Sequence, residues 1–230
     1  MMKLNLTKQN KYLLLVTLIF CISAIINIVI ISIDETVYIY DTADLRHRSI
    51  DYFEVLKSQN LTNFIELFNA KKIFYPPLFV LSSTPFYFFF GITQDVAAIT
   101  NLFYLFILFF SVFFTVKKLR NEKAALFAVI LSALTPGIYS FSRVYLPDFA
   151  LASVLSLAIC LMLHTDHFRN KLFTFSFGIV CGFGMLIKWS FIVYIFFPFV
   201  IYLIKSFKTD SLKKFDKQKL IFLFLSILFG

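Results

Sequence analysis

Long apolar runs separated by short basic segments dominate the chain. The first run, residues 12–33, is close to the roughly 20 residues that a helix needs to cross a bilayer. Further runs occupy about residues 76–92, 96–116, 124–141, 149–163, 172–187, 189–204 and 220–230. This pattern predicts an all-α protein: a polytopic integral membrane helical bundle that forms one transmembrane domain over residues 1–230.

The run at residues 76–92 differs from the others because it contains three prolines. Pro76 and Pro77 open it, and Pro85 lies inside it. Proline removes a helical hydrogen bond and clashes with the preceding turn. We therefore expect this short segment to be interfacial or re-entrant, whereas the other runs are predicted to span the membrane, the run at 220–230 only in part.

The composition excludes an ordinary soluble domain, with 60% hydrophobic residues, 20% aromatic residues and only 15% charged residues. The net charge of +9 does not indicate nucleic-acid binding, because Lys and Arg cluster between apolar runs, as in cytoplasmic loops. The three cysteines lie inside apolar runs and are read as small buried hydrophobic residues. The three histidines show no shared ligand spacing, so no metal site is predicted from them.

The distribution of basic residues predicts the orientation. With the N-terminus inside and residues 76–92 not spanning, residues 117–123, 164–171 and 205–219 are cytoplasmic, and 15 of the 22 Lys and Arg residues lie inside. The loop at residues 34–95 is then external. Apolar residues alternate with charges over its first part, which favours external juxtamembrane helices that lie along the membrane surface.

Several ionisable residues share this external side, and ionisable residues at membrane depth often serve a function. They are Asp34, Glu35, Arg143, Asp148 and Lys188. Each also has a purely structural interpretation. The acidic pair can begin an interfacial helix, the two cations can snorkel at helix ends, and Asp148 follows Pro147 in the first turn of a helix.

Five features in order carry a family resemblance. They are the acidic pair after the first run, the Pro76-Pro77-Leu78 segment, a short hydrophobic piece ending at Gly91, SALTPGIYSFSRVYLPDFALA at 132–152, and GIVCGFGMLIKWSFIVYIFFPFVIYL at 178–203. Together they resemble the GT-C glycosyltransferases. Within that class, the order of the five features resembles the N-terminal half of members of the protein O-mannosyltransferase and lipid A aminoarabinose transferase superfamily.

The resemblance implies a membrane glycosyltransferase that moves a sugar from a polyprenyl-phosphate-linked donor to an acceptor hydroxyl. The acceptor would be a lipid, a glycan or a protein, and the reaction would occur at the external face of a bacterial plasma membrane. No cofactor is predicted, and participation of a divalent metal stays open. Membrane lipids are expected partners, and nucleic acid is not.

The resemblance also implies roles for individual residues. Asp34 would be the catalytic base, and Glu35 would orient a cation or the loop. Asp148 would bind hydroxyls or pair with Arg143. The donor phosphate would be held by Arg143, Lys188 and Lys71 or Lys72. The residue before the diproline is often His or Lys in the family but is Tyr75 here. The polar contact that this position would make is therefore expected from Lys72 instead.

Two other classes of function stay open at this stage. A transporter would place ionisable residues near the midplane of the membrane. A non-catalytic membrane assembly protein would not depend on Asp34. The final run at 220–230 is shorter than a complete span, and we therefore expect the chain to be a truncated part of a longer enzyme.

Overall fold

The computed structural model describes residues 8–37, 39–69 and 75–208, and the regular elements within these ranges are helices. The long helices are α1 (Lys8–Ile33), α6 (Gln94–Leu119), α7 (Glu122–Leu134), α9 (Pro147–His164), α10 (Lys171–Ile187) and α11 (Phe191–Lys208). The others are α2 (Asp41–Lys57), α3 (Leu61–Phe68), α4 (Leu78–Leu81), α5 (Thr84–Phe90) and α8 (Pro136–Phe141).

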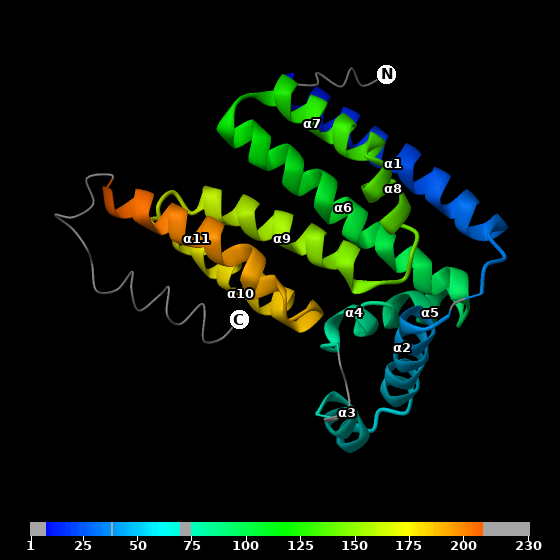
Figure 1. The fold of residues 1–230 in the computed structure, drawn as a ribbon. Coiled ribbons are helices and arrows are strands. Elements are labelled where there is room, and N and C mark those ends of the chain that lie inside the picture. The colour runs from blue at the N-terminus through cyan, green and yellow to red at the C-terminus, as the bar shows by residue number, and fades with distance from the viewer. Residues whose placement is uncertain (1–7, 38, 70–74, 209–230) are drawn as a thin grey trace, which may run out of the picture.

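Helix α6 is the centre of the bundle (Figure 1). It packs against α1, α7 and α9, and α9 in turn packs against α10 and α11. Two thirds (67%) of the most apolar window of α6 is buried, against 17% for α1. The exposed side of α1 carries large apolar residues such as Leu14, Leu18 and Ile25. Lipid chains rather than water suit such a surface.

Among the residues that the structure describes, three helices are long and apolar enough to cross a membrane: Lys11–Ile33, Gln94–Leu119 and Pro147–His164. The helical segments Lys171–Ile187 and Phe191–Ser206 are also apolar but shorter. The predicted fold class, an all-α membrane helical bundle, is therefore confirmed. The predicted run at 220–230 lies outside the described residues.

The run at residues 124–141 does not form the single helix expected from its hydrophobicity. Helix α7 ends at Leu134, and α8 begins at Pro136. Pro136 cannot donate a helical hydrogen bond, and it forces Thr135 into an extended conformation with φ −69° and ψ 119°. The break turns the chain so that the end of α8 returns to α1 and α6.

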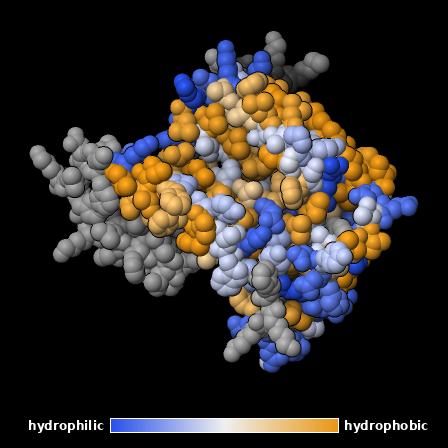
Figure 2. All heavy atoms as spheres, in the orientation of Figure 1, coloured by the Kyte–Doolittle hydropathy of each residue, from blue (hydrophilic) through white to orange (hydrophobic). Residues whose placement is uncertain are grey.

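The proline-containing segment at 76–92 forms two short helices, α4 of four residues and α5 of seven residues. At a rise of about 1.5 Å per residue, neither approaches the roughly 30 Å hydrocarbon core of a bilayer. Helices α2 and α3 project beside them at one end of the bundle (Figure 1). Figure 2 shows hydrophilic residues gathered over this end, while hydrophobic residues dominate the surface of the long helices.

Candidate active site

Two buried asparagines hold the connection between α8 and α9. Asn101 of α6 is fully buried, and its Nδ2 donates a hydrogen bond to the carbonyl oxygen of Val144 over 2.7 Å. Asn27 of α1 is 2% exposed, and its Nδ2 donates to Ser142 Oγ over 2.9 Å. These bonds fix the non-helical backbone that carries Arg143 and leads into α9, whose first turn carries Asp148.

A layer of hydroxyl groups lies beneath this connection. The phenol of fully buried Tyr145 shares a 2.6 Å hydrogen bond with Ser83, and Tyr104 donates to Ser82 over 2.9 Å. Burial raises the pKa of Tyr145, so this phenol stays neutral and acts here as a hydrogen-bond partner of Ser83. The layer ties the turn between α4 and α5 to α6 and to the start of α9.

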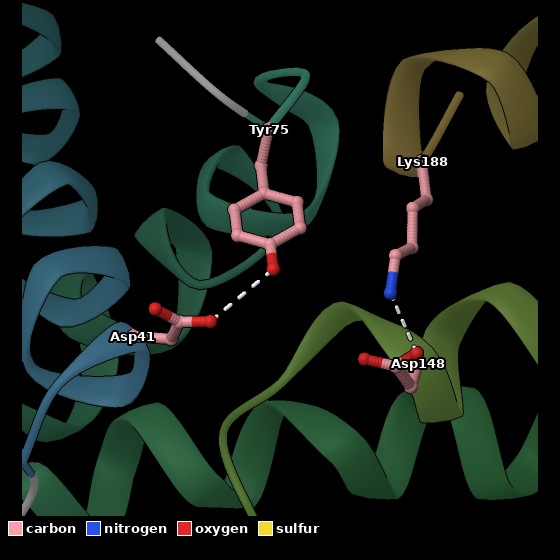
Figure 3. Close-up of polar contacts among 4 residues, drawn as sticks. All are labelled: Asp41, Tyr75, Asp148 and Lys188. Atoms are coloured by element: carbon pink, nitrogen blue, oxygen red, sulfur yellow. Dashed lines mark hydrogen bonds and ion pairs between the residues drawn. The ribbon is translucent and has the colours of Figure 1, made fainter. Parts of the chain in front are cut away.

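The first charged cluster forms where α9 begins. Lys188 Nζ donates to Asp148 Oδ1 over 2.6 Å and lies 5.6 Å from the centre of the Tyr75 ring. The Tyr75 hydroxyl donates to Asp41 Oδ2 over 3.3 Å (Figure 3). Burial, followed by the negative charge of Asp41, raises the pKa of Tyr75, so the phenol keeps its proton. We name Asp41, Tyr75, Asp148 and Lys188 the Lys188 cluster.

The turn between α10 and α11 sets the position of Lys188. Helix α10 ends at Ile187, and Lys188 is extended, with φ −157° and ψ 131°. The ring of buried Phe191 packs so tightly on Gly184 that an added Cβ would lie 2.3 Å from Cδ2 of the ring. Only glycine permits this approach, which closes the turn behind Lys188. The side chain of Lys188 is 23% exposed and that of Asp148 is 49% exposed, so solvent reaches this ion pair.

Asp34 stands just beyond the end of α1 and is exposed. Its Oδ1 accepts a hydrogen bond from the Thr36 hydroxyl and a 3.0 Å bond from the Thr36 backbone N–H. These two bonds, with a smaller contribution from the positive charge of Arg143, hold the pKa of Asp34 below its ordinary value. The carboxyl group is therefore ionised at neutral pH.

Asp34 and Arg143 line one small pocket of about 210 Å³. The Arg143 guanidinium lies 4.0 Å from the centre of the Tyr139 ring, and its Nε donates to the Tyr139 carbonyl oxygen over 3.2 Å. The stacking and the hydrogen bond hold the guanidinium in one orientation. Thr42 also lines this pocket, which we name the Asp34 pocket.

The Asp34 pocket and the Lys188 cluster are neighbours along two stretches of chain. Thr42 lines the pocket, and the preceding residue, Asp41, belongs to the cluster. Arg143 and Asp148 are separated by five residues, which limits their Cα separation to about 18 Å.

The other residues and groups considered in the sequence analysis have varied outcomes in the structure. Asp148 pairs with Lys188, where a pairing with Arg143 had been one alternative. Glu35 is exposed and, like Asp34, lies outside a helix, so the acidic pair does not begin an interfacial helix. Lys71 and Lys72 lie outside the described residues. Within the described part of the chain, no three His, Cys, Asp or Glu side chains form a group that could hold a metal ion.

Sequence reasoning missed Asp41, Thr36 and Tyr139. Asp41 carried a weak signal, since it is an acid at the start of helix α2, where carboxylates are favourable for structural reasons. Nothing in the sequence placed Thr36 on Asp34 or the Tyr139 ring under Arg143, because these contacts arise only from the folded backbone.

Comparison with known proteins gives the family. Residues 75–229 match the family model of dolichyl-phosphate-mannose-protein mannosyltransferases, and this is more than half of the 230-residue chain. The chain belongs to this family. The dolichyl-phosphate-mannose-protein mannosyltransferases are of the GT-C type, so the resemblance seen in the sequence is confirmed. No curated protein matches the chain.

The family match covers part of the site. Tyr75, Arg143, Asp148 and Lys188 lie within the matched residues, and Asp34 and Asp41 precede them. The assignment of Asp34 therefore depends on its position in the structure and its chemistry.

The lowered pKa of Asp34 gives a direct prediction. Thr36→Val removes the side-chain hydrogen bond, which is the largest cause of the shift, so the pKa of Asp34 should rise toward its ordinary value of 3.8. The carboxyl ¹³C chemical shift, followed against pH with Asp34→Asn for assignment, measures this pKa. Any stability from these bonds is present above pH 3.8 and is lost as the pH falls through the folded-state pKa.

Thr42→Val is the matched control, because Thr42 lines the same pocket but donates to the Ile39 carbonyl oxygen instead. It should leave the titration of Asp34 unchanged. An unchanged titration in Thr36→Val as well would show that the hydrogen bonds to Asp34 do not persist in the protein.

Proposed function

We propose that this chain contributes to sugar transfer from a polyprenyl-phosphate-linked donor to an acceptor hydroxyl at the external face of a bacterial plasma membrane. The observation that carries the proposal is that two side chains line one pocket: the ionised carboxylate of Asp34 and the guanidinium of Arg143, which is held in place on Tyr139. The family match supports the class of reaction. The donor, the acceptor and the face of the membrane are part of the proposal.

Arg143 and Lys188 are the proposed ligands of the donor phosphate. Charge-assisted hydrogen bonds from cations stabilise the negative charge that develops on a leaving phosphate. Arg143 is positioned before any ligand arrives by its stacking on Tyr139. Asp148 positions Lys188. Because the Asp148 carboxylate is half exposed, a phosphate can bind Lys188 beside this carboxylate or in its place.

Asp34 is the proposed general base. As the acceptor oxygen attacks the anomeric carbon, the bond between that carbon and the phosphate oxygen breaks, and the electron pair leaves with the polyprenyl phosphate. The acceptor hydroxyl proton passes to the carboxylate of Asp34. A low pKa keeps this carboxylate ionised and ready to accept a proton, although it also makes the group a weaker base.

The remaining candidates have supporting roles in this proposal. Asp148 would orient Lys188, and Tyr75 would fix the edge of the cluster through its bond to Asp41. Glu35, which is exposed beside Asp34, would attract a cation or a basic part of the loop. Lys72 is retained as a phosphate ligand on sequence grounds alone.

Asp34→Asn tests the catalytic assignment. The amide keeps the size of the side chain but cannot take up a proton, so sugar transfer should fall roughly 10²- to 10⁴-fold while donor binding persists. The measurement is transfer of a radiolabelled sugar from a polyprenyl-phosphate donor to endogenous acceptors in membranes that contain the 230-residue chain.

Glu54→Gln provides the control, because Glu54 is an exposed acid of α2 outside the Asp34 pocket and the Lys188 cluster. Its transfer rate should equal that of the unaltered chain. Full transfer by Asp34→Asn would leave Asp34 as a residue that only ends α1, and the proposed mechanism would be rejected.

The proposed face of the membrane has its own test. Asn60→Cys should react with a membrane-impermeant maleimide added outside, and Asn121→Cys should not, in a chain whose three native cysteines are replaced by alanine. The pair is matched, because each asparagine caps a helix by accepting one backbone N–H bond, in α3 and α7. Labelling at 121 without labelling at 60 would invert the proposed orientation and move the site to the cytoplasmic face.

A further inference from the structure

Arg48 of α2 belongs to neither the Asp34 pocket nor the Lys188 cluster, yet it is bonded to the backbone of a cluster residue. Its Nη2 donates a hydrogen bond to the carbonyl oxygen of Tyr75 over 3.1 Å. The two residues that follow Tyr75 are prolines, which have no N–H group to offer to the backbone around it. Because an ionised donor makes a stronger hydrogen bond than a neutral one, Arg48 fixes the backbone of Tyr75 where the chain enters α4.

Arg48 extends from a helix that is itself fixed to the bundle. The next residue, Ser49, is fully buried and shares a 2.7 Å hydrogen bond with the Tyr87 hydroxyl of α5. Arg48 is only partly exposed, and its Nε is buried and has no acceptor among the residues that the structure describes. The guanidinium is therefore turned toward the protein, where the Tyr75 carbonyl oxygen accepts its hydrogen bond.

Helix α2 holds Tyr75 at two points. Arg48 holds the carbonyl group, and Asp41 accepts a hydrogen bond from the hydroxyl group over 3.3 Å. Asp41 and Arg48 are seven residues apart, so they share one face of α2 and are separated by about 10 Å along its axis. Tyr75 is thus attached to this face of α2 by its backbone and by the far end of its side chain.

The ring that is held in this way contacts Lys188. The ammonium group lies 5.6 Å from the ring centre, within the roughly 6 Å over which an aromatic face attracts a cation. The ring and the Asp148 carboxylate approach the ammonium from different directions (Figure 3). A ring that moved away would leave Lys188 its ion pair with Asp148 and remove a second restraint.

We propose that Arg48 is a positioning residue for the phosphate site: it fixes the backbone of Tyr75 so that the Tyr75 ring restrains Lys188 for the donor phosphate. The inference rests on the proposed function, in which Lys188 binds that phosphate. Arg48 does not contact the phosphate in this proposal. Its effect on binding passes through Tyr75, and this distinguishes it from a direct phosphate ligand.

The test is the affinity of the 230-residue chain, in lipid nanodiscs, for a short-chain polyprenyl phosphate. Arg48→Met removes the hydrogen-bond donor but keeps an unbranched side chain, and it should raise Kd about 2- to 5-fold, the value of a cation–π contact at an exposed site. Arg48→Lys can still donate to the Tyr75 carbonyl oxygen and should retain most of the affinity. Arg46→Met is the matched control, because it removes the same charge from the same helix and leaves the bond from Arg48 to Tyr75 in place. Its Kd should be unchanged.

A second background shows whether Arg48 acts through Tyr75. Tyr75→Leu removes the ring, so adding Arg48→Met to it should weaken the affinity no further. An equal loss of affinity in both backgrounds would show that Arg48 acts on the phosphate directly or through the stability of the whole chain, and it would overturn the proposal. An unchanged Kd for Arg48→Met alone would also overturn it.

The titration of the Tyr75 phenol gives a readout that needs no ligand. Burial and the negative charge of Asp41 raise its pKa, so release of Tyr75 in Arg48→Met should lower this pKa toward the ordinary value of 10.0. Carbon-13 NMR of ring-labelled tyrosine follows the titration, with Tyr75→Phe for assignment. An unchanged titration would reject the positioning role and leave the proposed function intact. A lowered pKa in a chain that binds no polyprenyl phosphate would support the hold of Arg48 on Tyr75 and count against the proposed function.

Discussion

The structure depends on satisfying a stretch of non-helical backbone at the end of a membrane bundle. The chain between α8 and α9 cannot use helical hydrogen bonds, and unpaired carbonyl groups are costly where water is scarce. Asn101 meets this need at the Val144 carbonyl oxygen, and Asn27 holds the neighbouring Ser142. Because Arg143 lies in this connection and Asp148 follows it in the first turn of α9, the same bonds that stabilise the connection also position the charges of the site.

The break at Pro136 explains why the connection lies there. A continuous helix over residues 124–141 would carry Arg143 away along its own axis, whereas the break between α7 and α8 returns the chain to α1 and α6. The short helices α4 and α5 complete the arrangement, because Ser83 hydrogen-bonds to Tyr145 just before α9 begins. Prolines in the 76–92 and 124–141 segments thus shape the backbone that positions the site.

The sequence predicted the features that depend on hydrophobicity and chain-breaking residues. The membrane bundle followed from the apolar runs, and the prolines indicated that residues 76–92 would not form one long helix. The break at Pro136 could have been read from the same rule, but the apolar character of 124–141 concealed it. The ion pair of Lys188 with Asp148 could not be predicted, because it joins residues forty positions apart through the packing of α10 on α9.

Electrostatics separates the two carboxylates of the site. The hydrogen bonds from Thr36 lower the pKa of Asp34, while Asp148 is paired with Lys188. This division leaves Asp34 available for a proton and places Asp148 beside a cation, as the proposed transfer of a sugar from a phosphate would require. A transporter site would place its charges near the membrane midplane, whereas these lie at the ends of α1, α9 and α10.

The proposed mechanism requires that Arg143 of the Asp34 pocket and Lys188 of the Lys188 cluster bind one phosphate. The most direct measurement is a double-mutant cycle on the affinity for a short-chain polyprenyl phosphate, with Arg143→Gln, Lys188→Gln and both together. Binding to a shared phosphate predicts that each variant weakens affinity and that their effects are coupled by at least about 0.5 kcal/mol. Strictly additive effects, or no effect of either substitution, would contradict a single phosphate site.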